Sequence, residues 1–219
     1  MGKITVITGG TSGIGRGIAE KILAESAKED RIFVTYGHDE KKAAVFRDSL
    51  PEEKKSQVIL MKADMSSYDE MMAFVEELKK RADHIDWLVS NAGISTYAKY
   101  EDYSFEEWTR IVNTNLSVPV FMVKELRPMM VEGGSVLFTG SYAGQQAYSS
   151  SLVYGVTKAA IHFLTKSLVK EFEPKGITVN AIAPGFIETP WHSARTQESY
   201  DRINRKIALH RFGTVEEVA

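Results

Sequence analysis

Short apolar runs rich in β-branched residues alternate along the chain with longer segments in which apolar residues recur every three or four positions. Most of the short runs are apolar throughout, which is typical of parallel strands covered by helices on both faces. The runs predict strands over Ile4–Thr8, Ile32–Tyr36, Val58–Lys62, Trp87–Ser90, Ser135–Thr139 and Thr178–Ala183. The longer segments predict helices over Ile14–Ala27, Glu40–Leu50, Ser67–Ala82, Phe105–Val131 and Tyr154–Phe172.

This alternation predicts right-handed crossovers and an α/β fold, a three-layer doubly wound parallel sheet. No repeat, low-complexity tract or linker interrupts the 219 residues, so we expect residues 1–219 to form a single domain. Ser67, followed by Asp69 and Glu70, predicts a capped helix start, whereas Pro174 and Gly176 predict a helix end.

The segment Phe105–Val131 contains two prolines, Pro119 and Pro128. Proline inside a helix costs about 3 kcal/mol or more, so this segment must bend or break. A bend just after Asn115 would turn its carboxamide inward. A loop in which Asn115 has no role fits the same pattern equally well.

Composition and charge narrow the range of functions. Apolar residues make up 43% of the chain and charged residues 26%, as in ordinary globular domains. The formal charge of −2 argues against a nucleic-acid or polybasic membrane partner. The absence of cysteine excludes disulfides and thiolate sites, and the five histidines lack metal-ligand spacing, so we expect no metal. No signal peptide or long apolar stretch is present, and we expect a cytoplasmic protein.

A glycine-rich turn joins the first predicted strand to the first helix. Its glycines follow a G-x-x-x-G-x-G pattern within "TGGTSGIG" at residues 8–15. Glycine at such a junction permits positive φ and close approach of a pyrophosphate, and the helix N-terminus offers unpaired N–H groups. The turn therefore predicts a dinucleotide site formed by Gly9, Thr11, Ser12, Gly13, Ile14 and Gly15.

Three further strand ends fit a bound dinucleotide. Asp64 follows the third strand, "SNAGI" ends the fourth, and "APGFIETP" ends the sixth. Each of these alone is more often an ordinary turn. Because all lie at the carboxyl edge of the predicted sheet, where ligands bind in such folds, the pattern favours a cofactor crevice.

Ser141, Tyr154 and Lys158 are the candidate catalytic residues. Tyr154 and Lys158 are four residues apart, so both occupy one face of the predicted helix. A nearby ammonium favours the phenolate and would lower the pKa of the tyrosine from its ordinary value near 10. Ser141, just past the fifth strand, would hold a substrate carbonyl oxygen. An isolated Tyr-x-x-x-Lys is more often a packed tyrosine and a solvated lysine.

The matches are not isolated. "TGGTSGIG", "NAG" at 91–93, Asn115, Ser141, "YGVTK" at 154–158 and "PG" at 184–185 together resemble the classical short-chain dehydrogenase/reductases in order and spacing. Within that family, "GITVNAIAPGFIETP" and "RFGTVEEVA" are similar to bacterial 3-oxoacyl-acyl-carrier-protein reductases. A further helix and a final strand normally follow "RFGTVEEVA" there, and we expect the same sheet to need a strand beyond Ala219.

The resemblance implies a Rossmann sheet and reversible hydride transfer between a nicotinamide and a carbonyl or secondary alcohol. It implies that Tyr154 donates a proton, Lys158 lowers the pKa of Tyr154 and binds the ribose, Ser141 polarises the carbonyl, and Asn115 sustains a water relay. It assigns Asp64 and Met65 to the adenine, Asn91, Ala92 and Gly93 to the ribose, and Pro184, Gly185, Ile187 and Thr189 to the nicotinamide end. It also implies a homotetramer or homodimer. A catalytically silent dinucleotide sensor or scaffold is the alternative, and the presence of all four catalytic residues argues against it.

The end of the second strand bears on which dinucleotide is preferred. An acidic residue there would bind the ribose 2′-hydroxyl and repel a 2′-phosphate, but this chain has Tyr36, Gly37 and His38. We therefore expect NADP(H) to be favoured over NAD(H). Asp39, reaching back in a tighter turn, would restore NAD preference.

The substrate is expected to be a small molecule or an acyl thioester. Trp191, His192 and Tyr200 would cover one side of its pocket, and Tyr97, Tyr100 and Tyr103 the other, although surface packing explains each of them as well. A carrier-protein substrate calls for basic residues near the cleft, for which Arg127 and Lys170 are candidates.

Overall fold

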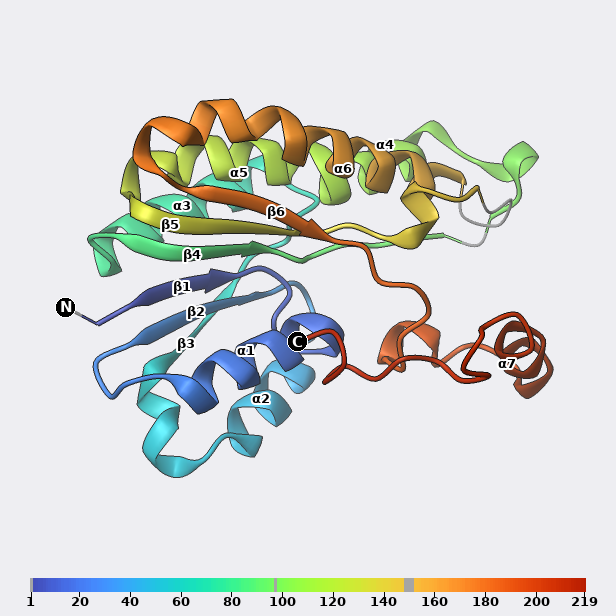
Figure 1. The fold of residues 1–219 in the computed structure, drawn as a ribbon, viewed down its shortest axis with the longest axis horizontal. Helices are drawn as coiled ribbons and strands as arrows, with labels where there is room; N and C mark the ends of the chain where they lie inside the picture. Colours follow the sequence, from blue (N-terminus) through green and yellow to red (C-terminus); the bar gives the residue numbers. More distant parts are fainter. Residues whose placement is uncertain (1, 97, 148–151) are drawn as a thin grey trace.

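The computed structural model describes residues 2–96, 98–147 and 152–219, and its centre is a six-stranded parallel sheet (Figure 1). The strand order is β3-β2-β1-β4-β5-β6, so β2 and β3 lie on one side of β1, and β4, β5 and β6 lie on the other. This is the doubly wound Rossmann order, which confirms the predicted fold class. The strands are β1 (Ile4–Ile7), β2 (Arg31–Tyr36), β3 (Val58–Lys62), β4 (Ile85–Ser90), β5 (Met130–Thr139) and β6 (Thr178–Ile182).

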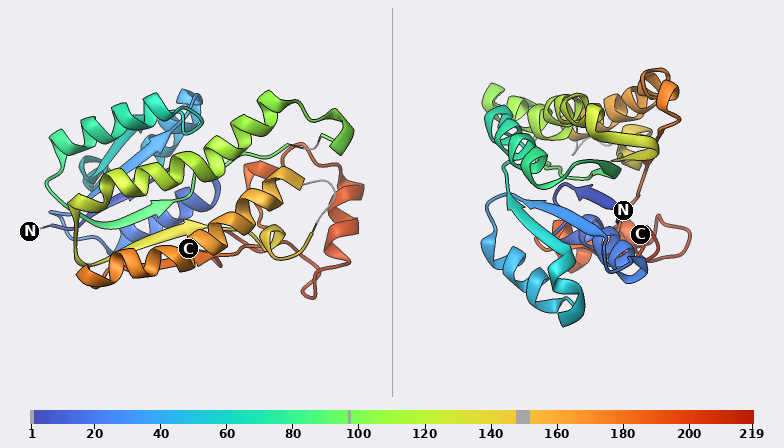
Figure 2. Two further views of the ribbon diagram at one scale, coloured as in Figure 1. Left: turned by 90° about the horizontal axis from the view of Figure 1, so that it is seen from above. Right: turned by 90° about the vertical axis from the view of Figure 1, so that its left-hand side faces the viewer.

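Helices cover both faces of this sheet, as the two views of Figure 2 show. One layer holds α1 and α2, and the other holds α3, α4, α5 and α6 (Figure 1). The helices are α1 (Gly13–Glu25), α2 (Glu40–Ser49), α3 (Tyr68–Arg81), α4 (Phe105–Val112), α5 (Val118–Leu126), α6 (Leu152–Phe172) and α7 (Gln197–Asn204). None of the helices in the described ranges has the length and hydropathy needed to cross a bilayer.

Two apolar cores lie on opposite sides of the sheet and explain why the strands are apolar throughout. Along β2, Phe33 faces the core under α3, α5 and α6, whereas Ile32 and Val34 face the core under α1 and α2. Successive side chains of a strand point to opposite faces, so a strand covered on both sides needs apolar residues at every position.

The segment predicted as one helix over Phe105–Val131 breaks where its prolines demand. A π-helical turn at Asn113–Ser117 separates α4 from α5, and Pro119 lies in the first turn of α5, where a missing N–H is tolerated. The predicted end at Val131 is wrong. Pro128 cannot continue the helix, so α5 ends at Leu126 and β5 begins at Met130, earlier than predicted.

The predicted helix ends are also seen. The Ser67 hydroxyl accepts a hydrogen bond from the Glu70 N–H at 3.2 Å, which caps α3. Gly176 has a φ of +61° and ends the turn that follows α6. After β6 the chain leaves the sheet, and α7 lies beyond the carboxyl ends of the strands (Figure 1). The chain then returns through a parallel bridge between Ile187 and Gly213.

Candidate active site

The carboxyl ends of the strands open into one cavity of about 1200 Å³. Most of the residues singled out in the sequence line it, although they come from the ends of all six strands and from α6. The lining residues that were predicted are Gly9, Ser12, Gly13, Ile14, Gly37, His38, Asp64, Met65, Asn91, Ala92, Gly93, Ser141, Tyr154, Lys158, Pro184, Gly185, Ile187 and Thr189. Thr11, Gly15, Tyr36 and Asn115 do not line it.

The glycine-rich turn has the backbone geometry of an anion cradle. Gly9 and Gly13 have φ values of +62° and +54°, which side-chain-bearing residues rarely adopt. Ser12 occupies the N-cap of α1, but its side chain accepts no hydrogen bond from the first turn. The first N–H groups of α1 and its positive dipole end therefore face the cavity without a side-chain cap, as phosphate binding at a helix N-terminus requires.

Asn91 holds this turn in place, a role that the sequence did not indicate. Its Nδ2 donates to the backbone oxygens of Thr8 at 3.0 Å and Gly9 at 3.2 Å, and its Oδ1 accepts from the Thr139 hydroxyl at 3.1 Å. A Cβ at position 15 would lie 2.3 Å from Asn91 Nδ2, so only glycine fits there. Asn91 thus ties β1, β4 and β5 together, and its carboxamide is fully used within the protein.

Tyr154 and Ser141 meet at the reacting end of the cavity. Tyr154 lies in the first turn of α6, and the Ser141 side chain is close enough to act on the pKa of its hydroxyl. The Ser141 Oγ also accepts from the Ala143 N–H at 3.1 Å, which orients it. Burial raises the pKa of the Tyr154 hydroxyl, and the Ser141 side chain opposes this only in part. At neutral pH the hydroxyl therefore carries its proton.

Lys158 lies one helical turn further along α6 and is 4% exposed. Its Nζ donates to the Thr139 backbone oxygen at 2.6 Å and lies 5.6 Å from the centroid of the Tyr154 ring. Burial lowers the pKa of Lys158 to about 8, so the ammonium is still mostly protonated at pH 7. The expected lowering of the Tyr154 pKa by Lys158 is not seen, because burial of the phenol dominates.

The predicted inward turn of Asn115 is confirmed, since its side chain is 2% exposed. Its Oδ1 accepts from the Ile94 N–H at 2.8 Å, and its Nδ2 donates to the Ile94 oxygen at 2.9 Å and to the Thr157 hydroxyl at 3.1 Å. The alternative of a loop at Asn115 is wrong, because the residue lies in the π-helical turn between α4 and α5, whereas its catalytic role stays a prediction. The carboxamide braces the segment after β4 against α6 from behind the cavity wall.

His162 belongs to the site and was missed in the sequence. Its Nε2 accepts a hydrogen bond from the Ser141 N–H at 3.3 Å. A Cβ at position 140 would lie 2.2 Å from the same nitrogen, so Gly140 lets the ring approach the backbone. Burial, and then the charge of Lys158, lowers the pKa of His162, which keeps Nε2 able to accept. Its spacing of four residues after Lys158 was the available signal.

The adenosine end of the cavity is arranged differently from the prediction. His38 and Asp64 form a 2.9 Å contact, so the His38 ring is held by a carboxylate. Burial alone would raise the pKa of Asp64, but hydrogen bonds from Ser66 and His38 outweigh it and hold that pKa below its usual range. Asp39 caps α2 through the Lys42 N–H at 2.9 Å and does not line the cavity. A second, smaller cavity of about 460 Å³ adjoins the glycine turn and is lined in part by Thr11, Arg16, Lys41 and Lys42.

The residues expected around the substrate divide into two groups. Trp191 and His192 line the cavity, with the Trp191 ring 5.7 Å from that of Tyr154. Tyr200 instead stacks on Phe212 at 4.7 Å. The following expected residues do not line the cavity either: Tyr100, Tyr103, Arg127 and Lys170; Tyr97 lies outside the described residues. Arg127 binds the Glu171 backbone oxygen near the opposite, amino-terminal edge of the sheet, where β5 begins.

Comparison with known proteins gives a consistent result. The model of a family described as short chain dehydrogenase matches residues 3–199. The 3-oxoacyl-[acyl-carrier-protein] reductase FabG of Aquifex aeolicus is 32% identical over 222 residues, covering 100% of this chain and 88% of that protein. A 3beta-hydroxysteroid dehydrogenase of Mediterraneibacter gnavus is 33% identical over 190 residues, covering 86% of this chain and 67% of that protein.

Solved structures show the same likeness. A short-chain dehydrogenase/reductase from Brucella melitensis has a TM-score of 0.88 at 31% identity, covering 99% of this chain and 85% of that one. A short chain dehydrogenase from Burkholderia cenocepacia, solved in complex with NADP, has a TM-score of 0.89 at 25% identity, covering 100% and 87%.

Proposed function

The chain belongs to the short-chain dehydrogenase family, and on that premise we propose that it transfers a hydride between a nicotinamide dinucleotide and a carbonyl or secondary alcohol, with Tyr154 as proton donor. The observation that carries the proposal is that Tyr154 and Ser141 line one cavity with the buried Lys158, whose Nζ lies 5.6 Å from the centroid of the Tyr154 ring. All three residues line the cavity that also contains the glycine-rich turn.

The residues present fit a dinucleotide. Gly9 and Gly13 have positive φ angles, and no side chain of the N-cap residue accepts a hydrogen bond from the first N–H groups of α1. Together they form a cradle for a diphosphate. A Cβ at Gly9 would lie 3.1 Å from Ala92, so a side chain there would crowd the crevice. A bound nicotinamide dinucleotide supplies or accepts the hydride. The Gly9–Gly13 turn would hold its diphosphate, and Lys158 would offer its ammonium to the ribose hydroxyls.

The protein's own residues handle the proton. In the direction of reduction, the Tyr154 hydroxyl donates its proton to the carbonyl oxygen, and the raised pKa of Tyr154 keeps that proton in place beforehand. The Ser141 hydroxyl, oriented by the Ala143 and His162 contacts, would hold the same oxygen. In the direction of oxidation, the Lys158 ammonium would favour the phenolate electrostatically.

The test measures consumption of NADPH and NADH with a panel of ketones and acyl thioesters. We expect Tyr154→Phe to lower kcat/KM by about 10²–10⁴-fold, because only the general acid is lost. Cofactor binding, followed by fluorescence titration, should be nearly unchanged. Tyr68→Phe is the matched control, since Tyr68 is 48% exposed on α3.

Near-normal turnover by Tyr154→Phe would refute the assignment of the proton donor. Cofactor binding without turnover of any ketone or alcohol would instead favour a dinucleotide sensor or scaffold.

We further propose that NADP(H) is preferred over NAD(H). The end of β2 presents Gly37 to the cavity, and a Cβ there would meet no atom within 4 Å, which leaves room for a 2′-phosphate. Asp39 is turned toward α2, and Lys41 lines the adjoining small cavity. The similar Burkholderia cenocepacia protein binds NADP.

Comparison of kcat/KM for the two cofactors decides this, and a tenfold preference for NADH, about 1.4 kcal/mol, would contradict it. We expect Gly37→Arg to increase the preference for NADPH, because a guanidinium can bind a phosphate with two hydrogen bonds.

The substrate is proposed to be a small molecule or an acyl thioester, which two similar proteins named as 3-oxoacyl-[acyl-carrier-protein] reductases support.

We also propose that residues 1–219 act as a single catalytic domain and that the chain forms homodimers or homotetramers. Light scattering coupled to size exclusion measures the oligomeric state, and a monomer at enzymatic concentrations would contradict this last proposal.

A further inference from the structure

The cavity is also lined by basic side chains that have no part in the proposed chemistry at Tyr154. One comes from α4 and four come from the segment after β6: Arg110, Arg195, Arg202, Lys206 and Arg211. Among the described lining residues the acidic one is Asp64, which is paired with His38 at the adenosine end. This concentration of positive charge contrasts with the formal charge of −2 of the whole chain.

Three of these cations lack a partner within the part of the chain that the structure describes. Arg211 forms a double contact with Glu217 at 2.6 and 2.8 Å, and Arg195 donates to His192 Nδ1 at 3.1 Å. No side-chain hydrogen bond or ion pair joins Arg110, Arg202 or Lys206 to another described residue. Like charges that face one cavity repel each other, and a bound anion removes that repulsion.

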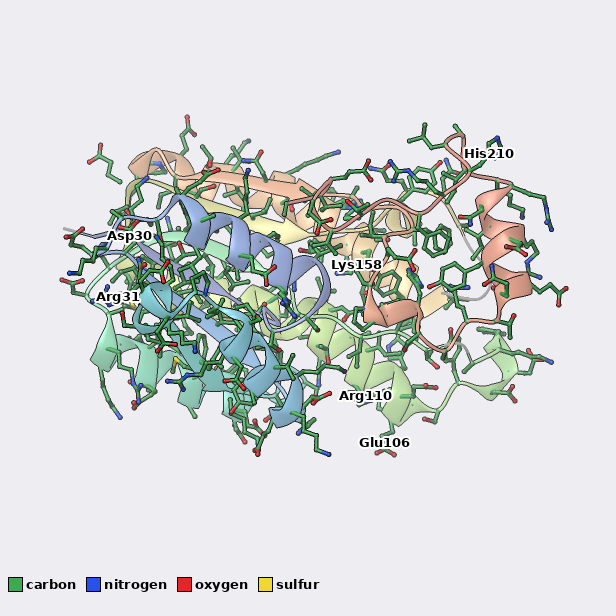
Figure 3. The ribbon with its side chains drawn as sticks, turned by 90° about the horizontal axis from the view of Figure 1, so that it is seen from below. Asp30, Arg31, Glu106, Arg110, Lys158 and His210 are labelled. Carbon is green, nitrogen blue, oxygen red and sulfur yellow. The ribbon has the colours of Figure 1, made fainter. Side chains whose placement is uncertain are left out.

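The three cations come from opposite sides of the fold. Arg110 projects from α4, in the layer above the sheet (Figures 1 and 3). Arg202 lies in the last turn of α7 and Lys206 lies two residues after the helix ends, and α7 lies beyond the strand ends (Figure 1). Arg205 lies between them in the sequence, is exposed, and does not line the cavity.

Apolar side chains line the same cavity as these cations and Tyr154. The Trp191 ring lies 5.7 Å from the Tyr154 ring, and Phe186, Ile203 and Ile207 also line the cavity. A molecule whose carbonyl lies at Tyr154 would therefore share its cavity with both apolar side chains and cations. Such a lining favours an apolar body with an anionic group.

We propose that the carbonyl substrate is an anion that places its apolar body against Trp191 and Phe186 and its carboxylate or phosphate between Arg110, Arg202 and Lys206. This inference rests on the proposed oxidoreductase function and specifies its substrate class. Carboxylate and phosphate share the chemistry that matters here, since a guanidinium fork can bind two oxygens of either group.

The experiment compares three ketones that share one apolar body: para-acetylbenzoate, its methyl ester, and para-acetylphenyl phosphate. With saturating cofactor, we expect kcat/KM for at least one anion to exceed that for the ester about tenfold, the worth of one hydrogen bond to a charged group. The advantage should shrink at high salt, because the site is open to solvent. The better of the two anions identifies the group that the site accepts.

The variant Arg202→Gln/Lys206→Gln should bring the anion-to-ester ratio of kcat/KM close to one. Arg205→Gln, which removes a charge from the same helix end outside the cavity, should leave the ratio unchanged. Equal turnover of the ester and both anions by the wild type, or a ratio that survives the double substitution, would overturn the inference while leaving the oxidoreductase function intact.

Calorimetric binding of para-acetylbenzoate to the cofactor-loaded protein gives a second readout that does not need turnover. We expect para-acetylbenzoate to bind more tightly than its methyl ester, and the double substitution to remove the difference. If none of the three ketones is reduced, this binding difference still decides whether the anion site exists, and the wider panel of ketones and acyl thioesters decides the oxidoreductase function separately.

Discussion

Replacing Asn115 by alanine tests whether this buried carboxamide braces the active site. In the structure its Oδ1 and Nδ2 make three hydrogen bonds, at 2.8, 2.9 and 3.1 Å, to Ile94 and Thr157. The substitution leaves the Ile94 N–H and oxygen and the Thr157 hydroxyl each one partner short. We therefore expect Asn115→Ala to destabilise the whole protein as well as to impair catalysis.

The magnitude follows from the surroundings of Ile94. An intramolecular hydrogen bond contributes about 1 kcal/mol net, and more when the abandoned group stays dry. Ile94 lines the cavity, where water can replace the lost partner, so about 1 kcal/mol applies to each of its two bonds. Thr157 is fully buried and does not line the cavity, so the loss of its bond costs at least as much. The three bonds then amount to about 3 kcal/mol or more, which corresponds to a fall in Tm of at least roughly 6–12 °C for a domain of this size.

The assay is urea denaturation followed by circular dichroism, with the m value checked so that a shift in the midpoint reports stability. Asn113→Ala is the matched control, because Asn113 begins the same π-helical turn and its side chain bonds to no other described residue. Asn115→Asp keeps the volume but replaces the donor that faces the Ile94 oxygen by an acceptor. We expect it to lose at least as much stability as Asn115→Ala. Equal midpoints for Asn115→Ala and Asn113→Ala would refute the bracing role.

Two further predictions concern titratable groups on α6, Lys158 and His162. Lys158→Met should raise the free energy of unfolding at pH 7. Burying the charged lysine, whose pKa is lowered from 10.5 to about 8, costs the folded wild type about 3 kcal/mol, and the variant avoids that cost. The variant also loses the hydrogen bond to the Thr139 oxygen, which takes back about 1 kcal/mol. Between about pH 8 and 10.5 the unfolded wild type binds more protons than the folded wild type, so the wild type gains stability as pH rises. The stability advantage of the variant should therefore shrink across that window. A constant difference between the urea midpoints of the two proteins would contradict this. His162→Leu should lower kcat more than His162→Gln does, since glutamine keeps an acceptor for the Ser141 N–H, and equal kcat values would show that this hydrogen bond does not position Ser141.

The local pattern of the sequence was sufficient to predict most of the strands and helices and to place the candidate site at the ends of the strands. The bounds of β3 agree with the prediction because the apolar run Val58–Met61 lies between the polar residues Gln57 and Lys62. The glycine-rich turn was predictable because positive φ at Gly9 and Gly13 is a property of those residues alone. The carboxyl ends of parallel strands share one edge, so assigning the strands already placed Ser141 near Asn91 and Pro184.

The tertiary structure decided how those residues interact, because burial and partners depend on segments far apart in the chain. Asn91 braces the glycine turn through Thr8 and Thr139, and His162 reaches the Ser141 backbone across the fold. The pKa of Tyr154 is raised rather than lowered because the surrounding chain desolvates it, which no spacing of tyrosine and lysine shows. Likewise, Arg110 and Arg202 are 92 positions apart in the sequence, and only the packing of α4 and α7 around one cavity gives them a common ligand to bind.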